Sequence, residues 1–205
     1  MHKTNQMTKI LLPTNLAKHT SQNPVQKLLI NNFYSSLFSL IKSLRTDSIL
    51  DAGCGEGFTM DKLIKNGIGR KIEGIEYSKD SISYGKKLFP DLTIKQESIY
   101  DLPYKDDSFD LVLCTEVLEH LEEPSKALRE ILRVGKKYLL ITVPNEPFFR
   151  LSNFLRGKNM SRLGNDEGHI NHWNPRSLRR LLNQNKISVK EIKLPFPWIM
   201  ILGTK

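Results

Sequence analysis

The sequence predicts an α/β fold in which a doubly wound, mostly parallel sheet carries helices on both faces. The first observation is an alternation along residues 47–205 between short apolar runs, which suit buried parallel strands, and amphipathic helical patterns. The second is the glycine cluster DAGCGEG at residues 51–57, which follows the apolar pair Ile49 and Leu50. Apolar residues that stop at such a cluster are typical of a buried strand that turns sharply into a helix. A sheet of this kind binds ligands at the carboxyl ends of its strands.

Length and composition fit a single domain. A chain of 205 residues can form one sizeable core and is short for two. No apolar run approaches the ~20 residues that span a bilayer, and the N-terminus holds too short an apolar stretch for a signal peptide. Cys54 and Cys114 have neither disulfide nor metal-type spacing. We therefore expect a cytoplasmic protein, with peripheral attachment to a membrane left open. Oligomeric state does not follow from the sequence.

The positive charge is concentrated in two flanking segments. Of the net charge of +9, residues 1–46 carry +6, residues 47–146 carry −5 and residues 147–190 carry +7. Basic flanks around a mildly acidic centre fit a phosphate-bearing substrate, nucleic acid or an anionic membrane surface. Lysines that merely solvate exposed helices are the alternative interpretation.

We divide the chain into a basic N-terminal segment, residues 1–46, and a main domain, residues 47–205. Residues 1–22 are polar and irregular, so we expect them to be poorly ordered or loosely docked. An amphipathic helix is predicted to begin at Asn23-Pro24, a capping residue followed by proline in the first turn, and to reach Arg45. This helix is expected to pack on the core, to cover the ligand as a lid, or to do both.

The elements that follow the glycine cluster are marked by caps and periodicity. A helix closes at Gly67, and the strand over residues 71–76 ends in a carboxylate. Ser78 caps a helix that ends before Pro90, and a short third strand covers residues 92–96.

The second half of the chain repeats this alternation with one interruption. The expected elements are a nearly continuous apolar strand at 110–114, a helix from Pro124, a strand at 138–143, a helix from Asn174-Pro175 and closing strands at 187–194 and 198–202. The interruption is residues 144–174, a connection far longer than usual in such folds.

The charge of the glycine cluster distinguishes between two ligand classes. Dinucleotide-binding turns have the spacing G-x-G-x-x-G, whereas this cluster reads G-x-G-x-G and continues with Phe58. Asp51 at the strand end would repel a pyrophosphate and would suit a positively charged ligand. S-adenosylmethionine carries both an ammonium and a sulfonium. A plain glycine turn in a dehydrogenase-like domain is the alternative.

The motif D-A-G-C-G-E-G resembles the first motif of class I S-adenosylmethionine-dependent methyltransferases, in the small-molecule branch called type 11. The resemblance covers roughly residues 40–205. It implies a Rossmann-like methyltransferase fold of seven strands, the last antiparallel. It also implies S-adenosylmethionine as the cofactor and S-adenosylhomocysteine as the product.

Four polar residues fall at predicted strand ends and are expected to converge on one crevice: Asp51, Glu76, Ser98 and Thr115. Glu76 lies 23 residues after Gly53, the distance at which an acid can accept both ribose hydroxyls of an adenosine. The predicted cofactor-binding residues are Asp51, Ala52, Gly53, Cys54, Gly55, Glu76, Tyr77, Ser98, Ile99, Thr115 and Glu116.

Ser98 departs from the family pattern, which usually has Asp there to accept the adenine amino group. A serine hydroxyl can still accept that hydrogen bond. Glu97 and the backbone of Ile99 are the alternatives for this contact.

Residues 144–174 are predicted to form a cap inserted over the active end of the sheet. Large hydrophobic residues alternate there with arginines and a lysine, a pattern that suits a lid over an anionic or lipid-linked substrate. A satellite packing helix is the alternative. The segment ends with G-H-I-N-H-W at residues 168–173.

Methyl transfer from a sulfonium depends mainly on holding the acceptor in line. A hydroxyl acceptor also needs a general base. We predict His169 and His172 as the catalytic residues, because their segment should face the crevice. Glu116, Glu119 and His120 are further candidates at the same mouth.

Glu116, Glu119 and His120 have the spacing of one helical face, and with a downstream histidine they would suit a divalent metal. This E-x-x-E-H string resembles the metal motif of small-RNA 3′-terminal 2′-O-methyltransferases, and similar residues occur in ubiquinone-type O-methyltransferases. The string is also common in relatives for which no metal is expected. We therefore predict no metal ligand: Glu116 borders the methionine pocket, and Glu119 and His120 cap the next turn.

The sequence thus predicts a methyltransferase that acts on an oxygen of a small molecule, such as a phosphorylated or lipid-linked sugar or isoprenoid. The expected partner is this acceptor, anionic or membrane-associated, ahead of RNA. The first alternative is a metal-dependent RNA 2′-O-methyltransferase, although no appended RNA-binding domain is recognisable. The second is a non-catalytic regulator that binds S-adenosylmethionine.

Overall fold

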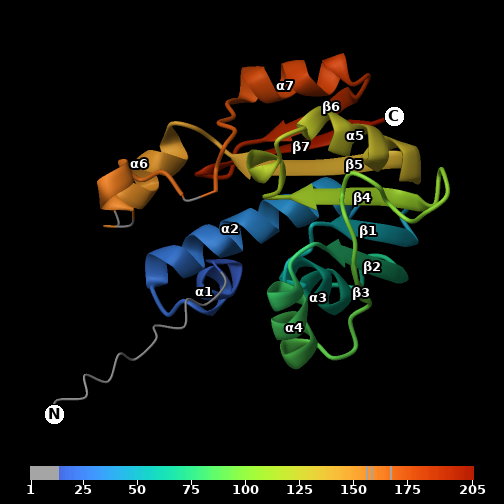
Figure 1. The fold of residues 1–205 in the computed structure, drawn as a ribbon, viewed down its shortest axis with the longest axis horizontal. Helices are drawn as coiled ribbons and strands as arrows, with labels where there is room; N and C mark the ends of the chain where they lie inside the picture. The colour runs from blue at the N-terminus through green and yellow to red at the C-terminus, as the bar shows by residue number, and fades with distance from the viewer. Residues whose placement is uncertain (1–13, 156, 158, 167) are drawn as a thin grey trace, which may run out of the picture.

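A seven-stranded sheet forms the centre of the protein. The computed structural model describes residues 14–155, 157, 159–166 and 168–205. The strands are β1 (Ser48–Ala52), β2 (Lys71–Glu76), β3 (Ile94–Gln96), β4 (Phe109–Thr115), β5 (Gly135–Pro144), β6 (Ser188–Lys193) and β7 (Trp198–Thr204). They lie in the order β3-β2-β1-β4-β5-β7-β6, and β7 runs antiparallel to both of its neighbours (Figure 1). The predicted doubly wound sheet with an antiparallel last strand is confirmed.

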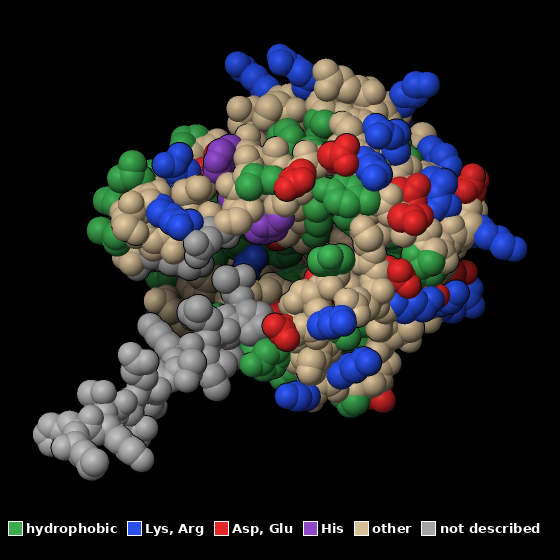
Figure 2. All heavy atoms as spheres, viewed as in Figure 1, with side chains coloured by type: hydrophobic (Ala, Val, Ile, Leu, Met, Phe, Trp, Pro, Cys, Tyr) green, Lys and Arg blue, Asp and Glu red, His purple; other side chains and the backbone are tan. Residues whose placement is uncertain are grey.

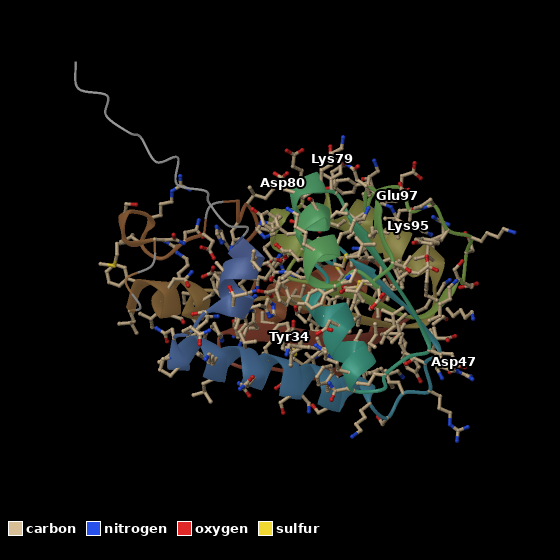
Figure 3. The ribbon with its side chains drawn as sticks, turned by 90° about the horizontal axis from the view of Figure 1, so that it is seen from below. Tyr34, Asp47, Lys79, Asp80, Lys95 and Glu97 are labelled. Atoms are coloured by element: carbon tan, nitrogen blue, oxygen red, sulfur yellow. The ribbon has the colours of Figure 1, made fainter. Side chains whose placement is uncertain are left out.

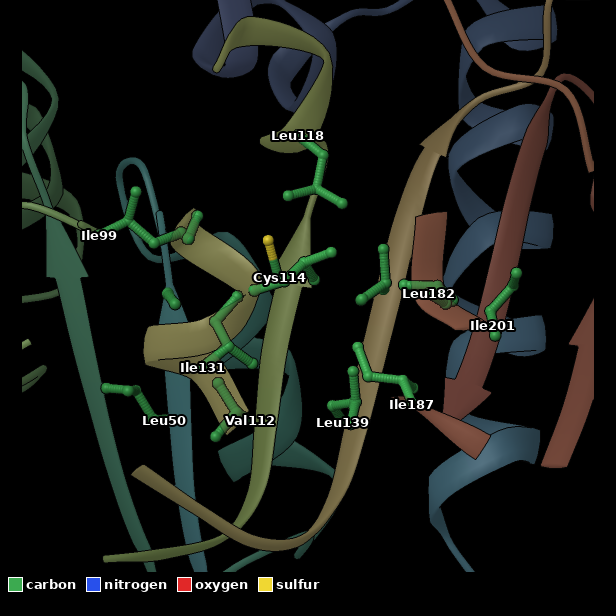
Figure 4. Packing of buried hydrophobic residues seen from close by; sticks show 14 of the residues in the cluster. Leu50, Ile99, Val112, Cys114, Leu118, Ile131, Leu139, Leu182, Ile187 and Ile201 are labelled. Atoms are coloured by element: carbon green, nitrogen blue, oxygen red, sulfur yellow. The ribbon is translucent and has the colours of Figure 1, made fainter. Parts of the chain in front are cut away.

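Helices cover both faces of this sheet. They are α1 (Thr14–Thr20), α2 (Pro24–Ile41), α3 (Phe58–Lys65), α4 (Lys79–Leu88), η1 (Leu118–His120), α5 (Pro124–Val134), α6 (Phe148–Leu155), η2 (Met160–Arg162) and α7 (Pro175–Gln184). Buried residues of α2 and α3 pack against one face of the strands. Those of α5 and α7 pack against the other face, where Figure 4 shows the cluster around Val112 and Cys114.

The central strand β4 explains why the sheet needs helices on both sides. Leu111 and Leu113 point into the core cluster with α2, whereas Val112 and Cys114 point into the cluster with α5 and α7. All four side chains are buried. Each buried side chain of the size of Leu or Val stabilises the fold by about 1.5–3 kcal/mol relative to exposure, so the continuous apolar run fixes β4 in the middle of the sheet.

The predicted helix starts are confirmed by their caps. The Asn23 side chain accepts hydrogen bonds from the amides of Val25 and Gln26, at 2.9 and 3.2 Å. Asn174 forms a capping box with Ser177 at the start of α7. The end of the first long helix was placed too late, because α2 ends at Ile41 and the following residues turn towards β1.

The N-terminal segment contains a helix that the sequence does not predict. Residues 14–20, expected to be poorly ordered or loosely docked, form α1, in which Leu16 is buried. The helix is short and has too few apolar residues to show periodicity, so its stability comes from tertiary contacts. The rest of that expectation, for residues 1–13, lies outside the described residues.

The carboxyl ends of the parallel strands face the side of the molecule that carries α1 and α6 (Figure 1). Figure 3 shows Asp47, which precedes β1, on the side opposite to α1. The long connection 144–174 contains α6 and η2 and therefore lies at the edge where ligands of such sheets bind. Within the described residues, none of the helices has both the length and the apolarity needed to cross a membrane.

Candidate active site

The glycine cluster forms a tight turn between β1 and α3. Gly53 and Gly55 have positive φ angles of 85° and 56°, a conformation that favours glycine. A Cβ atom on Gly53 would lie 2.5 Å from Cγ2 of Val117, so a side chain there would displace that residue. The amides of Gly53 and Cys54 both donate to the carbonyl of Ile75 at 2.9 Å. The turn is thus held against the end of β2.

Asp51 lies just before the turn with an unsatisfied carboxylate. The side chain is fully buried, and neither carboxylate oxygen has a hydrogen-bond partner among the described residues. Burial, and then the negative charge of Glu76, raise the pKa of Asp51 to about 7. A buried carboxylate without a partner is costly unless a ligand supplies donors or positive charge. This position therefore fits a cationic group.

Glu76 joins the glycine turn to the start of α4. Its Oε2 accepts a hydrogen bond from the amide of Gly55 at 2.9 Å, and its Oε1 accepts one from the amide of Ser78 at 2.8 Å. Each carboxylate oxygen can accept a further bond. Tyr77, the next predicted residue, is 77% exposed at the edge of this turn.

The other predicted cofactor residues lie at the carboxyl ends of β1, β3 and β4 or directly after them. Ala52 and Ile99 are buried, and burial raises the pKa of the Cys54 thiol, which makes this cysteine an apolar lining residue. The Ser98 hydroxyl accepts a bond from the amide of Tyr100 at 3.2 Å. Thr115 ends β4, paired with Thr142 of β5.

The side chain of Glu116 is held by residues that no motif in the sequence connects with it. Its Oε2 accepts a 2.6 Å hydrogen bond from the indole Nε1 of Trp198 on β7 and lies 3.6 Å from Nζ of Lys18 on α1. Thr142 Oγ1 is 3.4 Å from Oε1. Burial raises the pKa of Glu116, and the charge of Lys18 opposes this rise. The carboxylate thus ties α1 and β7 to the end of β4.

Glu116, Glu119 and His120 do not share the predicted helical turn. Glu116 has a φ of 58°, in the left-handed region, and the following helix η1 covers only residues 118–120. The reversed backbone at Glu116 turns its side chain towards β7. Glu119 and His120 instead contact the segment 168–171.

Helix α1 covers the glycine turn. Asn15 Nδ2 donates to Glu56 Oε2 at 2.8 Å and lies 2.9 Å from the position that a Cβ on Gly55 would occupy. The His19 ring stacks on Phe58 with 4.3 Å between centroids. Burial lowers the pKa of His19 to about 3, so this imidazole is neutral. The helix that contacts the glycine turn is thus α1, whereas the predicted lid is the long helix α2.

Asn15→Ala is expected to loosen α1 without unfolding the domain. The change removes one partly buried hydrogen bond, worth about 0.5–1.5 kcal/mol, and leaves the core of the sheet intact. Amide hydrogen exchange in residues 14–20 should therefore become faster, whereas exchange in β4 should stay unchanged. Equal acceleration in both elements would show that α1 is not a separate cover.

The two predicted catalytic histidines lie on a segment beside β5 and contact different neighbours. His172 Nδ1 is 3.9 Å from Oε1 of Glu146, the second residue after β5. Burial raises the pKa of Glu146. The His169 ring lies 4.9 Å from that of His120 and 5.4 Å from that of Phe149. Figure 2 shows histidine side chains beside a hollow in the surface.

Comparisons with known proteins indicate what this chain is similar to. Residues 50–140 match the family model of a methyltransferase domain. A probable S-adenosylmethionine-dependent methyltransferase of Mycobacterium tuberculosis is 30% identical over 103 residues, which are 49% of this chain and 37% of the relative. An uncharacterized methyltransferase of Bacillus subtilis is 26% identical over 172 residues, 76% of this chain and 65% of the relative. Magnesium protoporphyrin IX methyltransferase from Synechocystis, solved with bound SAH, has a TM-score of 0.66 at 16% identity over 94% of both chains.

The fold and the site define a class of protein: a doubly wound α/β domain whose first glycine turn adjoins a buried acid. Within that class, the match of residues 50–140 to a methyltransferase domain supports a class I S-adenosylmethionine-dependent methyltransferase of the type 11 branch. The match spans well under half the length of the mycobacterial relatives, 37–39% of each.

Proposed function

We propose that this protein is an enzyme that transfers the methyl group of S-adenosylmethionine to an oxygen atom of a small amphiphilic molecule. The observation that carries the proposal is the buried Asp51 carboxylate beside the glycine turn, whose oxygens have no hydrogen-bond partner in the described part of the chain. An ammonium on a ligand would satisfy this carboxylate, whereas an anionic ligand would be repelled.

The residues around the turn fit the remaining parts of this cofactor. The bare backbone from Gly53 to Gly55 allows close approach. The Glu76 carboxylate is oriented by two backbone amides and keeps acceptor capacity for ribose hydroxyls. Ser98 and the backbone of Ile99 are the proposed adenine contacts. When bound, the cofactor supplies a methyl group on a leaving group that is already activated, so the protein's main task is positioning.

The class of acceptor is inferred from the surface of α6 and η2. Six large apolar side chains in this stretch of 16 residues are 39–76% exposed: Phe148, Leu151, Phe154, Leu155, Met160 and Leu163. Arg150 and Arg162 lie among them, and Figure 2 shows hydrophobic and basic side chains on the part of the surface that α6 occupies in Figure 1. A concentrated apolar patch usually contacts an apolar partner. These features favour an acceptor with an apolar portion and an anionic group.

His172 is the proposed proton acceptor for the hydroxyl. Its imidazole is accessible, with 43% of the side chain exposed, and Nδ1 lies 3.9 Å from Oε1 of Glu146. An accessible imidazole nitrogen can accept a proton from a hydroxyl. The pair therefore suits a group that must gain a proton when the oxygen is methylated.

The proposal is tested by transfer of labelled methyl from S-adenosylmethionine to matched compounds. A hydroxylated, anionic long-chain compound should be labelled, and its methyl ether should not, because the ether lacks the accepting hydroxyl. A short-chain analogue should react more slowly because it lacks the apolar portion. Labelling of an amine analogue in preference to the hydroxyl compound would contradict oxygen as the acceptor. Tight S-adenosylhomocysteine binding without transfer to any hydroxyl compound would favour a regulator.

His172→Asn is expected to lower kcat by about 10²–10⁴-fold, the usual contribution of a general base. The KM for S-adenosylmethionine should stay the same, because His172 is not among the residues proposed to hold the cofactor. A variant that keeps the kcat of the wild type would assign the proton to another group.

A further inference from the structure

Three potential metal ligands meet between η1 and the segment that precedes α7. One ligand atom each from Glu119, His120 and His169 lies within 4.8 Å of the others. The residues come from two segments almost 50 positions apart in the sequence, so the cluster is a product of the tertiary fold. It is located directly after β4, at the edge of the sheet where the candidate active site lies.

Glu119 is the member of the cluster that most needs a cation. The residue is only 1% exposed, and neither of its carboxylate oxygens has a hydrogen-bond partner among the residues that the structure describes. Glu116 differs, because its carboxylate is satisfied by Trp198 and lies near Lys18. An ionised, buried carboxylate without partners is strongly unfavourable, and metal coordination is one of the ways in which proteins satisfy it.

His120 is oriented in the way that metal-binding histidines usually are. Its Nδ1 lies 2.9 Å from the carbonyl oxygen of Gly168. Since a carbonyl only accepts, Nδ1 carries the proton, and Nε2 presents its lone pair. A backbone carbonyl that fixes the tautomer in this manner is a common outer partner of a metal-bound imidazole.

The two segments are clamped together independently of any ion. The backbone amides of Ile170 and Asn171 donate to the carbonyl of Glu119 at 2.9 and 3.0 Å. The Asn171 side chain donates to the carbonyls of Leu118 and Leu121, at 3.1 and 2.6 Å. These bonds fix the backbone of η1 against the segment that carries His169. The ligand set is therefore pre-organised rather than formed by mobile surface side chains.

We propose that Glu119, His120 and His169 bind a divalent transition-metal ion. One carboxylate oxygen and two imidazole nitrogens suit Mn²⁺, Fe²⁺, Co²⁺ or Zn²⁺, whereas Mg²⁺ and Ca²⁺ prefer sets made of oxygen alone. Three protein ligands leave coordination positions open, as in catalytic metal sites. Given the proposed function, the open positions would take the acceptor's oxygen and make its hydroxyl more acidic, with His172 as the base.

In the first test, Mn²⁺ is titrated into the untagged full chain. Bound metal is removed beforehand with a chelator, and the chelator is then removed as well. Free Mn²⁺ is followed by electron paramagnetic resonance during the titration. We expect one bound ion per chain, and Mg²⁺ should compete at least about 10-fold more weakly. Glu119→Gln and His169→Asn should each weaken Mn²⁺ binding by at least about 100-fold, more than changes in outer-shell partners usually do. His172→Asn, three residues from His169, is the matched control and should bind as the wild type does.

A second measurement separates a metal ligand from a structural carboxylate. Mn²⁺ at about 100 times its Kd should raise the Tm of the wild type by roughly 5 °C and leave that of Glu119→Gln unchanged. Without metal, Glu119→Gln should melt no lower than the wild type, because the amide removes a buried charge. A lower Tm of the metal-free variant, or Mn²⁺ binding that survives both substitutions, would overturn the proposal. So would a folded wild type that binds no Mn²⁺.

Neither measurement uses S-adenosylmethionine or an acceptor. If the protein binds no metal at this site, the proposed methyl transfer is therefore not contradicted. Conversely, one equivalent of bound Mn²⁺ in a protein that transfers no methyl group would remove the proposed function and keep the site.

Discussion

Asp51→Asn is expected to weaken the binding of S-adenosylhomocysteine by about 30- to 4000-fold. The substitution keeps the shape of the side chain and removes the charge that we propose to face the ligand's ammonium. Loss of one partner of a buried, hydrogen-bonded charge pair costs about 2–5 kcal/mol. The measurement is calorimetric titration at pH 8, where the wild-type carboxyl group, with its pKa of about 7, is ionised.

Asp47→Asn is the matched control for this titration. Asp47 precedes the same strand, lies at the opposite end of the sheet in Figure 3, and forms its ion pair with Arg70. The control should bind S-adenosylhomocysteine as tightly as the wild type. In the wild type, affinity should also fall as the pH is lowered below about 7, because the ligand's cation then competes with a proton for Asp51. Binding by Asp51→Asn within threefold of the wild type would contradict the assignment of Asp51.

The second large effect has the opposite sign: Asp51→Asn should make the ligand-free protein more stable at pH 8. The carboxyl group has a pKa of about 7 when folded, against 3.8 for an aspartate in the unfolded chain. Between these values the folded state binds more protons, so the free energy of unfolding falls as the pH rises from about 4 to 7. This difference in pKa between the folded and unfolded states corresponds to at most about 4 kcal/mol. The neutral amide avoids this loss.

This stabilisation is measured by urea unfolding of the wild type and Asp51→Asn without ligand at several pH values. The difference between the two proteins should be largest above pH 7 and should vanish near pH 4. A buried amide that also lacks partners will reduce the gain below the full figure. A variant that is less stable at pH 8 would mean that the carboxylate is satisfied within the fold. Gained stability together with lost binding would mark Asp51 as a residue retained for its ligand.

Much of the fold is predictable because its signals are local. The run from Leu111 to Cys114 is apolar on both faces, which requires a central strand, and Asn23 and Asn174 cap helices through atoms two or three residues away. The glycine turn is equally local, since its residues alternate between glycine and others within the cluster that follows β1. Such features depend on short stretches of chain and not on the way distant segments meet.

The less predictable parts depend on contacts between distant segments. Trp198 reaches Glu116 across 82 positions, and α1 is held by contacts such as those of Asn15 and His19 around the glycine turn. The spacing of E-x-x-E-H predicts one shared face, but the left-handed backbone at Glu116 separates its side chain from those of Glu119 and His120. No periodicity in a sequence records a single reversed residue of this kind.

The position of β7 has a consequence for folding. Strand β6 is attached to the rest of the sheet through β7, which lies between β5 and β6, and β7 also supplies the indole that binds Glu116. If the β6–β7 hairpin opens as one cooperative unit, as such supersecondary motifs often do, the sheet loses an edge and the carboxylate loses its donor in the same event. Partial unfolding at this edge would then disturb the candidate active site in the same event, so that slow-exchanging amides in β7 would report the fraction of molecules in which Glu116 keeps its donor.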